Sequence, residues 1–296
     1  MLLRTLLLTG AAFAGLAASA SAADLKAVAS FTVLADIVHH VGGDKVTVTS
    51  LVGPDGDPHE FEPTPANAKA LKAADITFVS GLGLEGWMDR LISASGYKGK
   101  PVVASEGIST RTMEEDGKTV TDPHVWNSPV NVKVWVANVE KALSAADPAD
   151  AATFKANAEA YSKKLDELNA YAHQKFDRIA EDRRKVLTSH DAFGYLGREY
   201  KITFLSPLGI STETEASAGD VSKLIEQIKT EKVKTYFFEN SNDPRLVKQV
   251  AKATGAQPGG ELYVESLSKA KGPAPTYEKM FRYNVDQLAT AMEKSS

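Results

Sequence analysis

The sequence predicts an α/β fold of two sheet-and-helix lobes that are joined by one long, rigid helix. Residues 26–105 and 185–264 both alternate short apolar segments with segments of helical pattern. Between these regions, residues 149–184 contain neither Gly nor Pro and are rich in Ala, Lys, Glu and Leu, which favour helices. The 296 residues also exceed the roughly 100–200 residues of a typical single domain, so two lobes are expected.

The N-terminal lobe, residues 23–147, is expected to hold a mainly parallel sheet, because strands that alternate with helices pair in this way. Thr64 precedes Pro65, a combination that predicts an N-cap and the first turn of a helix. The predicted strands are 26–30, 45–52, 76–80 and 101–105, and the predicted helices are 32–41, one beginning at 65, 85–93 and 131–146.

The linker helix, placed at residues 148–184, would reach roughly 50 Å and cross a whole lobe. A coiled-coil arm is the alternative, but the segment lacks sustained heptads. The same alternation resumes in the C-terminal lobe, residues 185–296. Its predicted strands are 185–189, 201–205, 234–238 and 261–264, and its predicted helices are 192–200, 219–230, 243–255 and 276–294.

Residues 1–22 have the pattern of an export signal. Arg4 supplies the positive charge, residues 6–18 are apolar, and Ala20-Ser21-Ala22 is a small-residue cleavage site. A membrane anchor is the alternative, but the apolar stretch is short for a membrane span. We therefore expect cleavage near Ala22, no stable membrane insertion, and a monomer in the periplasm.

Composition excludes several classes of function. The absence of Cys removes disulfides, thiolate metal sites and the lipidated cysteine that anchors some exported proteins. The net charge is −4 and the densest basic run is only residues 183–185, so no nucleic-acid partner is expected.

Three of the six histidines share a context. His59, His124 and His190 each lie beyond a predicted strand or in an adjoining loop, at the sheet edge where ligands bind in open α/β folds. Imidazole is a good ligand for Zn, Cu, Fe and Ni. The spacing is no compact zinc signature, so these residues alone leave a metal site and ordinary loop histidines both open. Trp126 and Phe193 lie beside these histidines, although a place in the core is the simpler interpretation for both.

Longer motifs surround these histidines and continue to the end of the chain. They are residues 56–65 (GDPHEFEPTP), 122–126 (DPHVW), 189–195 (SHDAFGY), 263–267, 276–280 and 283–284. On these motifs, the chain resembles the solute-binding proteins of zinc and manganese ABC importers that contain a long linker helix. The resemblance covers nearly the whole mature chain.

The resemblance implies a metal site between the lobes with four ligands, which match His59, His124, His190 and Glu265. The fourth position is usually Asp in the family, so Glu265 departs from the pattern. Three imidazoles and one carboxylate suit Zn²⁺. Manganese members tend to replace the third histidine by a carboxylate, so His190 favours zinc, with Mn²⁺ as the alternative. The metal would be cargo for the transmembrane permease of an ABC importer, and the protein would not be an enzyme.

Carboxylates often accept the second ring N–H of a metal-binding histidine. Asp191, Glu60 and Glu239 are the candidates, with an ordinary helix-start or loop acid as the alternative for each and the favoured one for Glu60. Residues 110–121, where zinc-type members often carry a His-rich loop, contain no histidine.

Two other classes of protein, a secreted zinc hydrolase and a surface adhesin, are alternatives to a metal-binding transport protein. A secreted zinc hydrolase could use a metal-bound water, but the sequence lacks His-Glu-x-x-His and similar compact motifs. A surface adhesin is disfavoured by the missing lipid anchor.

Overall fold

The computed structural model describes residues 25–115, 118–213 and 216–294. The predicted signal segment lies outside these ranges. Within them, no helix combines the length and the apolar character that a membrane crossing requires.

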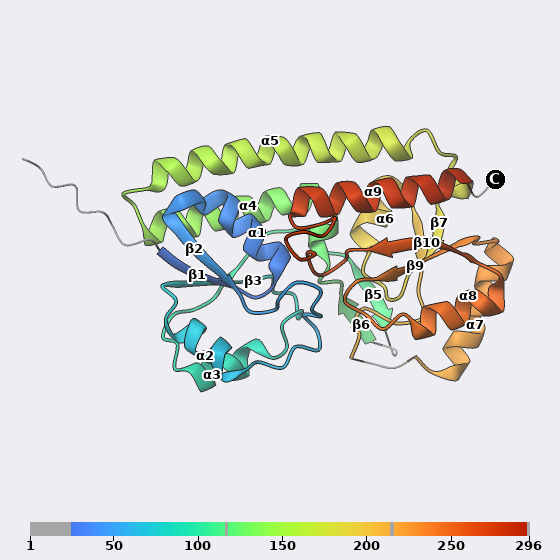
Figure 1. The fold of residues 1–296 in the computed structure, drawn as a ribbon, viewed down its shortest axis with the longest axis horizontal. Helices are drawn as coiled ribbons and strands as arrows, with labels where there is room; N and C mark the ends of the chain where they lie inside the picture. The colour runs from blue at the N-terminus through green and yellow to red at the C-terminus, as the bar shows by residue number, and fades with distance from the viewer. Residues whose placement is uncertain (1–24, 116–117, 214–215, 295–296) are drawn as a thin grey trace, which may run out of the picture.

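The N-terminal lobe is built on a four-stranded parallel sheet in the order β2-β1-β3-β4. Helices α1 and α4 lie on one side of this sheet, and α2 and α3 lie on the other (Figure 1). The elements are β1 (Leu25–Ala29), α1 (Thr32–Gly42), β2 (Val46–Ser50), α2 (Pro65–Lys72), β3 (Ile76–Val79), α3 (Met88–Ser95), β4 (Val102–Val103) and α4 (Pro129–Ala146).

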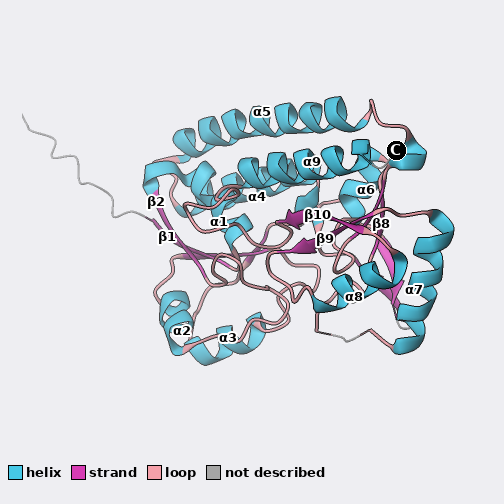
Figure 2. Cartoon of the chain, turned by 45° about the vertical axis from the view of Figure 1, so that its right-hand side comes forward, coloured by secondary structure: helices cyan, strands magenta, loops and turns pink. Residues whose placement is uncertain are grey.

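The C-terminal lobe is built on a second parallel sheet in the order β10-β9-β7-β8. Its strands and those of the first sheet lie in the middle of the molecule, with helices above and below (Figure 2). The elements are β7 (Lys185–Leu187), α6 (Gly194–Tyr200), β8 (Thr203–Leu205), α7 (Ala218–Glu231), β9 (Thr235–Glu239), α8 (Arg245–Thr254), β10 (Gln257–Leu262) and α9 (Tyr277–Lys294).

The two sheets have the same topology, because the second, third and fourth strand of each lobe occupy the same places relative to the first. The α/β prediction with two lobes is confirmed. An antiparallel hairpin, β5 (Thr112–Glu115) and β6 (Lys118–Thr121), was not predicted. It occupies the region where the sequence lacks a His-rich loop.

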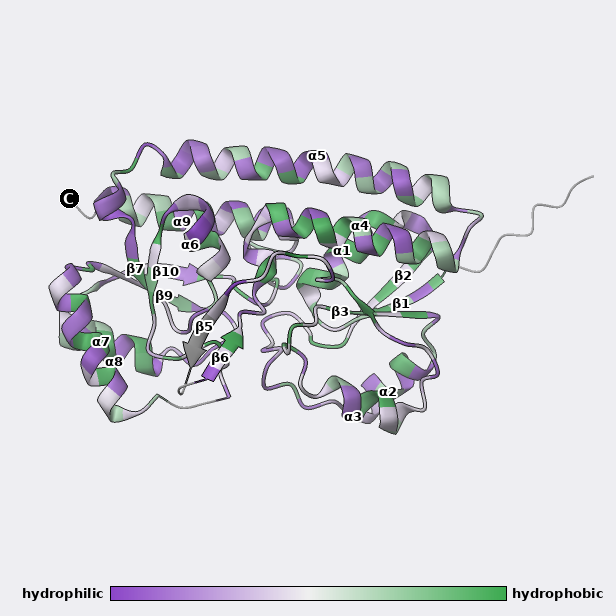
Figure 3. Ribbon diagram, turned by 180° about the vertical axis from the view of Figure 1, so that it is seen from behind, coloured by the Kyte–Doolittle hydropathy of each residue, from purple (hydrophilic) through white to green (hydrophobic). Residues whose placement is uncertain are grey.

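The long helix α5 (Ala151–Phe176) packs against α1 and α4 in one lobe and against α6 and α9 in the other. Its 26 residues span about 39 Å, less than the predicted run to residue 184 would give. The helix ends at Phe176 because the next residues make other contacts. Ile179 is buried in the core, with 4% of its surface exposed, and the buried Arg184 donates hydrogen bonds to the carbonyl groups of Ile179 and Tyr200. Viewed from behind, α5 is largely hydrophilic while α4 beneath it is more apolar (Figure 3).

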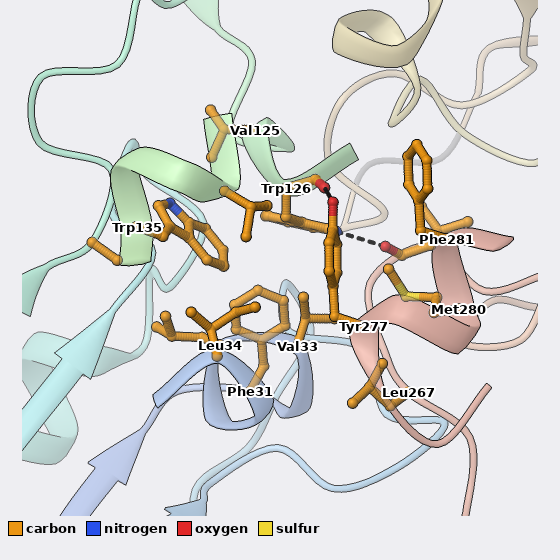
Figure 4. Packing of buried hydrophobic residues seen from close by; sticks show 14 of the residues in the cluster. Phe31, Val33, Leu34, Val125, Trp126, Trp135, Leu267, Tyr277, Met280 and Phe281 are labelled. Carbon is orange, nitrogen blue, oxygen red and sulfur yellow. Dashed lines mark hydrogen bonds between the residues drawn. The ribbon is translucent and has the colours of Figure 1, made fainter. Parts of the chain in front are cut away.

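The apolar core does not stop at the boundary between the lobes. One continuous cluster of buried side chains joins Phe31 and Trp135 of the N-terminal lobe to Tyr277 and Phe281 of α9 through Trp126 (Figure 4). The segments that approach the lobe boundary are therefore packed on a shared core.

Candidate metal centre

Four side chains meet between the lobes, each from a loop that follows a strand. His59 lies in the loop after β2, and His124 lies after β6, at the start of a short 3₁₀ turn (Val125–Asn127). His190 follows β7 and Glu265 follows β10. Because parallel strands end at the same sheet edge, the loops after β2, β7 and β10 lie at the carboxyl edges of the two sheets. His124 reaches the same place from the end of the antiparallel hairpin.

The ligand atoms of the four side chains converge on one point. Glu265 Oε1 lies 2.7 Å from His59 Nε2, 3.2 Å from His124 Nε2 and 3.3 Å from His190 Nε2. His124 Nε2 lies 3.2 Å from His59 Nε2 and 3.4 Å from His190 Nε2. All four ligand atoms lie within 4.8 Å of one another.

These separations fit a small four-coordinate cation. In a tetrahedron with metal–ligand bonds of about 2.0–2.1 Å, the ligand atoms are about 3.3–3.4 Å apart. Four of the five measured separations are 3.2–3.4 Å, and the contact of His59 with Glu265 is shorter at 2.7 Å. The arrangement can therefore accept a divalent metal after a small outward movement of Glu265 or His59.

The four side chains differ in their access to solvent. His124, His190 and Glu265 are fully buried, whereas His59 is 6% exposed. A pocket of about 500 Å³ opens beside His59, and acidic side chains of Glu60, Glu62 and Glu213 line it with Arg90. Solvent therefore approaches the four-ligand cluster over His59.

His190 is held by Glu239, at the end of β9. Glu239 Oε2 lies 2.5 Å from His190 Nδ1, and Glu239 Oε1 accepts the backbone N–H groups of Ser189 and His190. Asn242 donates a further hydrogen bond to Glu239 Oε2. Burial alone would lower the pKa of His190, but the charges of Glu239 and Glu265 outweigh it and raise this pKa well above its usual value.

His124 is held by Asp122. Asp122 Oδ1 accepts hydrogen bonds from the Nδ1 and backbone N–H of His124, and Oδ2 pairs with Arg111 at 2.8 Å. Burial alone would raise the pKa of Asp122, but the hydrogen bonds from His124 and the charge of Arg111 lower it. Although burial opposes it, the bond to Asp122 raises the pKa of His124. Gly194 makes room for this pair, because a Cβ there would lie 1.2 Å from Arg111 Nη1.

His59 is held through its backbone. Asp57 Oδ1 accepts the His59 N–H at 2.7 Å, and Thr212 from the C-terminal lobe donates to Asp57 Oδ2 at 2.7 Å. Trp87 donates from Nε1 to the carbonyl of Pro58. The loop carrying His59 is thus tied to both lobes.

Glu265 directs one oxygen to the three histidines and the other away from them. Its Oε2 accepts a hydrogen bond from Ser241 at 3.3 Å. Burial alone would raise the pKa of Glu265, but the charges of His59 and His190 hold it well below its usual value. Glu265 is therefore ionised and oriented to offer a single oxygen.

The three predicted partner acids lie in different surroundings. Glu239 contacts the ring of His190, as described above. Within the described residues, neither Asp191 nor Glu60 makes a hydrogen bond to any of the three histidine rings; Glu60 is exposed and Asp191 is half-buried. Asp57 and Asp122, which hold His59 and His124, were not predicted as partner acids. A signal for them existed, because Asp-Pro-His occurs at both 57–59 and 122–124.

Comparison with known proteins identifies the family of the chain. Residues 27–291 match the family model of ZnuA, described as the periplasmic component A of the zinc-uptake complex. The chain belongs to this family. An iron-binding protein of Yersinia pestis, YfeA, is 35% identical over 287 residues, which cover 96% of this chain and 91% of that protein. A metal ABC transporter substrate-binding lipoprotein of Streptococcus sanguinis, SsaB, is 32% identical, with 94% of this chain and 92% of that protein covered.

Solved structures of periplasmic metal-binding proteins are also similar. The periplasmic zinc-binding protein TroA of Treponema pallidum superposes with a TM-score of 0.86 at 30% identity, covering 91% of this chain and 99% of that one. An Mn-bound mutant of a periplasmic metal-binding protein from Candidatus Liberibacter asiaticus gives 0.84 at 31% identity, covering 90% and 99%. The chain is thus a metal-binding substrate-binding protein of the ABC transporter type. Such proteins are not enzymes, which answers the hydrolase alternative.

Proposed function

We propose that this protein binds Zn²⁺ with His59, His124, His190 and Glu265 and delivers it to the permease of an ABC importer. The convergence of four ligand atoms within 4.8 Å is the observation that carries the proposal. Zn²⁺ is held by four ligands in closed sites, and imidazole with carboxylate is a common ligand set for it.

The orientation of Glu265 supports zinc over a metal with more ligands. Oε1 is directed to the histidines while Oε2 is turned to Ser241, so the protein supplies four donor atoms. Mn²⁺ favours oxygen ligands in octahedral sites, and for a given set of ligands it binds more weakly than Zn²⁺. A site of three nitrogens and one oxygen therefore favours zinc.

Mn²⁺ or Fe²⁺ is the second candidate cargo, because YfeA is named an iron-binding protein and a similar solved structure is Mn-bound. To bind either ion, the site would need more oxygen ligands than the single Oε1 atom of Glu265. Turning Glu265 Oε2 away from Ser241, or adding water, would supply them.

The export signal at residues 1–22 supports a periplasmic location after cleavage near Ala22. We further propose that the mature protein is a monomer. We also propose that the N-terminal lobe ends at residue 147 and that the C-terminal lobe begins at residue 185, with the linker between them.

Calorimetric titration of metal-stripped mature protein with Zn²⁺ and Mn²⁺ tests the function. Replacement of His59, His124, His190 or Glu265 by Ala should each reduce Zn²⁺ affinity more than the roughly 10–100-fold typical of supporting residues. His173→Ala is the matched control, because His173 lies half-buried on α5 and is not one of the four clustered side chains, and it should leave binding unchanged.

Two results would contradict the proposal. Equal or tighter binding of Mn²⁺ would reject zinc as the cargo. Unchanged Zn²⁺ affinity in Glu265→Ala would remove Glu265 from the ligand set.

A further inference from the structure

We propose that Trp126 is a positioning residue that couples the ligand His124 to the ligand Glu265 across the boundary between the lobes. This inference rests on the proposed metal-binding function. Within the described residues, the indole of Trp126 forms no hydrogen bond with the four ligand atoms, but its ring packs against one ligand ring and its N–H binds the backbone beside another ligand.

The indole N–H makes the connection. Trp126 Nε1 donates to the carbonyl oxygen of Val264 at 2.7 Å, and Val264 directly precedes Glu265. The indole ring also packs edge-on against the imidazole of His124, with 5.4 Å between ring centroids. One rigid side chain therefore relates the position of a ligand after β10 to that of a ligand before α4.

The backbone of Trp126 is also anchored. The Tyr277 hydroxyl donates to the Trp126 carbonyl at 2.8 Å (Figure 4). Asp36 accepts the backbone N–H of Tyr277 at 2.9 Å. Asp36 belongs to α1 and Tyr277 begins α9. Trp126 is thus held from the helices of both lobes.

Tight packing prevents the indole from adopting another orientation. Trp126 is fully buried, Phe31 packs edge-on against it at 4.9 Å between centroids, and Trp135 lies 6.0 Å away. A buried indole N–H requires a hydrogen-bond acceptor. The carbonyl of Val264 provides it and so stabilises the indole in this orientation. Loss of the bond would let the loop of Glu265 shift relative to His124.

Trp135 provides a matched control. It belongs to the same buried cluster, is also fully buried, and donates its own Nε1 hydrogen bond, to Ser105 Oγ at 3.0 Å. That bond does not involve the backbone beside a ligand. Trp126→Phe and Trp135→Phe therefore remove the same kind of group from the same core, and only the first breaks the link between two ligands.

The test compares the two variants in the mature protein by Zn²⁺ titration, by thermal unfolding of the metal-free form, and by the visible spectrum of bound Co²⁺. We expect Trp126→Phe to weaken Zn²⁺ binding roughly 10–100-fold, the range seen for residues that orient ligands. It should also change the Co²⁺ absorption bands, which report ligand geometry. Trp135→Phe should keep the spectrum and bind Zn²⁺ within about threefold of wild type, even where both variants lose similar thermal stability.

Equal Zn²⁺ affinities and unchanged Co²⁺ spectra in both variants would overturn the inference. If Trp126→Phe does not fold, Trp126→Met carries the test, because a flexible apolar side chain fills part of the same space and removes the indole N–H. Unchanged affinity and spectrum in that variant would overturn the inference equally. Failure of the wild-type protein to bind Zn²⁺ or Co²⁺ would instead reject the proposed function itself.

Discussion

The two lobes share one strand order but hold their proposed ligands differently. In the C-terminal lobe, His190 and Glu265 each lie three residues after the end of a strand, β7 and β10. In the N-terminal lobe, His59 lies nine residues after β2, and His124 follows the hairpin that extends beyond β4. The same topology therefore supplies two ligands close to the sheet and two ligands on longer loops.

The contrast is clearest where neighbouring central strands end. At the ends of β7 and β9, Glu239 binds His190 and its backbone. At the corresponding ends of β1 and β3, Glu85 accepts hydrogen bonds from Ser30, Ser80 and Gly81 and holds no histidine. A carboxylate lies at both positions, but of the two only Glu239 contacts a proposed ligand, His190. The fold provides equivalent places, and the residue types decide which place is used.

Among variants that compare the two lobes and keep all four ligands, the largest effect is expected from breaking the support of each lobe in turn. Glu239→Gln and Asp122→Asn should each lower Zn²⁺ affinity roughly 10–100-fold. Glu239→Gln should be the more harmful, because Glu239 binds the ring and two backbone N–H groups while Arg111 still orients residue 122. Zn²⁺ titration measures both, with Glu60→Gln as the control. A smaller loss in Glu239→Gln would mean that the N-terminal ligands are the more strictly held.

An intermediate effect is expected from pH. The pKa values of His190 and His124 are raised in the folded protein, so their protonation stabilises the metal-free fold at low pH. This contribution is lost as the pH rises through the raised pKa values. The lowered pKa of Glu265 has the opposite sign, and its contribution is lost as pH falls through that value. Zn²⁺ must displace the histidine protons, so each displaced proton should strengthen binding about tenfold per pH unit, about 1.4 kcal/mol.

Thermal unfolding with and without Zn²⁺ measures this dependence. The increase in Tm on adding Zn²⁺ should be larger at pH 8 than at pH 6. In His190→Ala, the remaining increase should depend less on pH. An increase that is independent of pH would show that the histidines are already free of protons in the metal-free protein.

The smallest effect is expected from the contact between the lobes at Asp57. Thr212→Val removes the hydroxyl that binds Asp57 Oδ2 and should weaken Zn²⁺ binding roughly threefold to tenfold, as the loss of one hydrogen bond would. Thr254→Val is the control, because its hydroxyl binds only carbonyls within α8. Equal affinities in the two variants would show that the loop of His59 does not depend on the other lobe.

The secondary structure was predicted well where periodicity is long and less well elsewhere. The linker helix was placed correctly but ends at Phe176, eight residues before the expected end. Composition could not locate this end, because the burial of Ile179 and the hydrogen bonds of Arg184 decide it. The hairpin β5–β6 was missed because its strands are short and, within the described residues, pair with each other and with no other strand.

The residues of the site were available in the sequence, while their contacts were not. His59, His124, His190 and Glu265 were named from motifs, and Asp57 and Asp122 were present in a repeated Asp-Pro-His that was not used. The link from Trp126 to Val264 joins residues 138 positions apart, so no local pattern indicates it.

The sequence by itself determined the α/β class and the long helix, because strand and helix periodicity are local properties. Its motifs proposed the four ligands only through their resemblance to a known family. Only the tertiary structure decided that the four ligand atoms meet within 4.8 Å, that Glu265 offers one oxygen, and that Trp126 ties one lobe to the other. These features depend on distances between loops that follow different strands. Such distances are set by how the two sheets pack on a shared core.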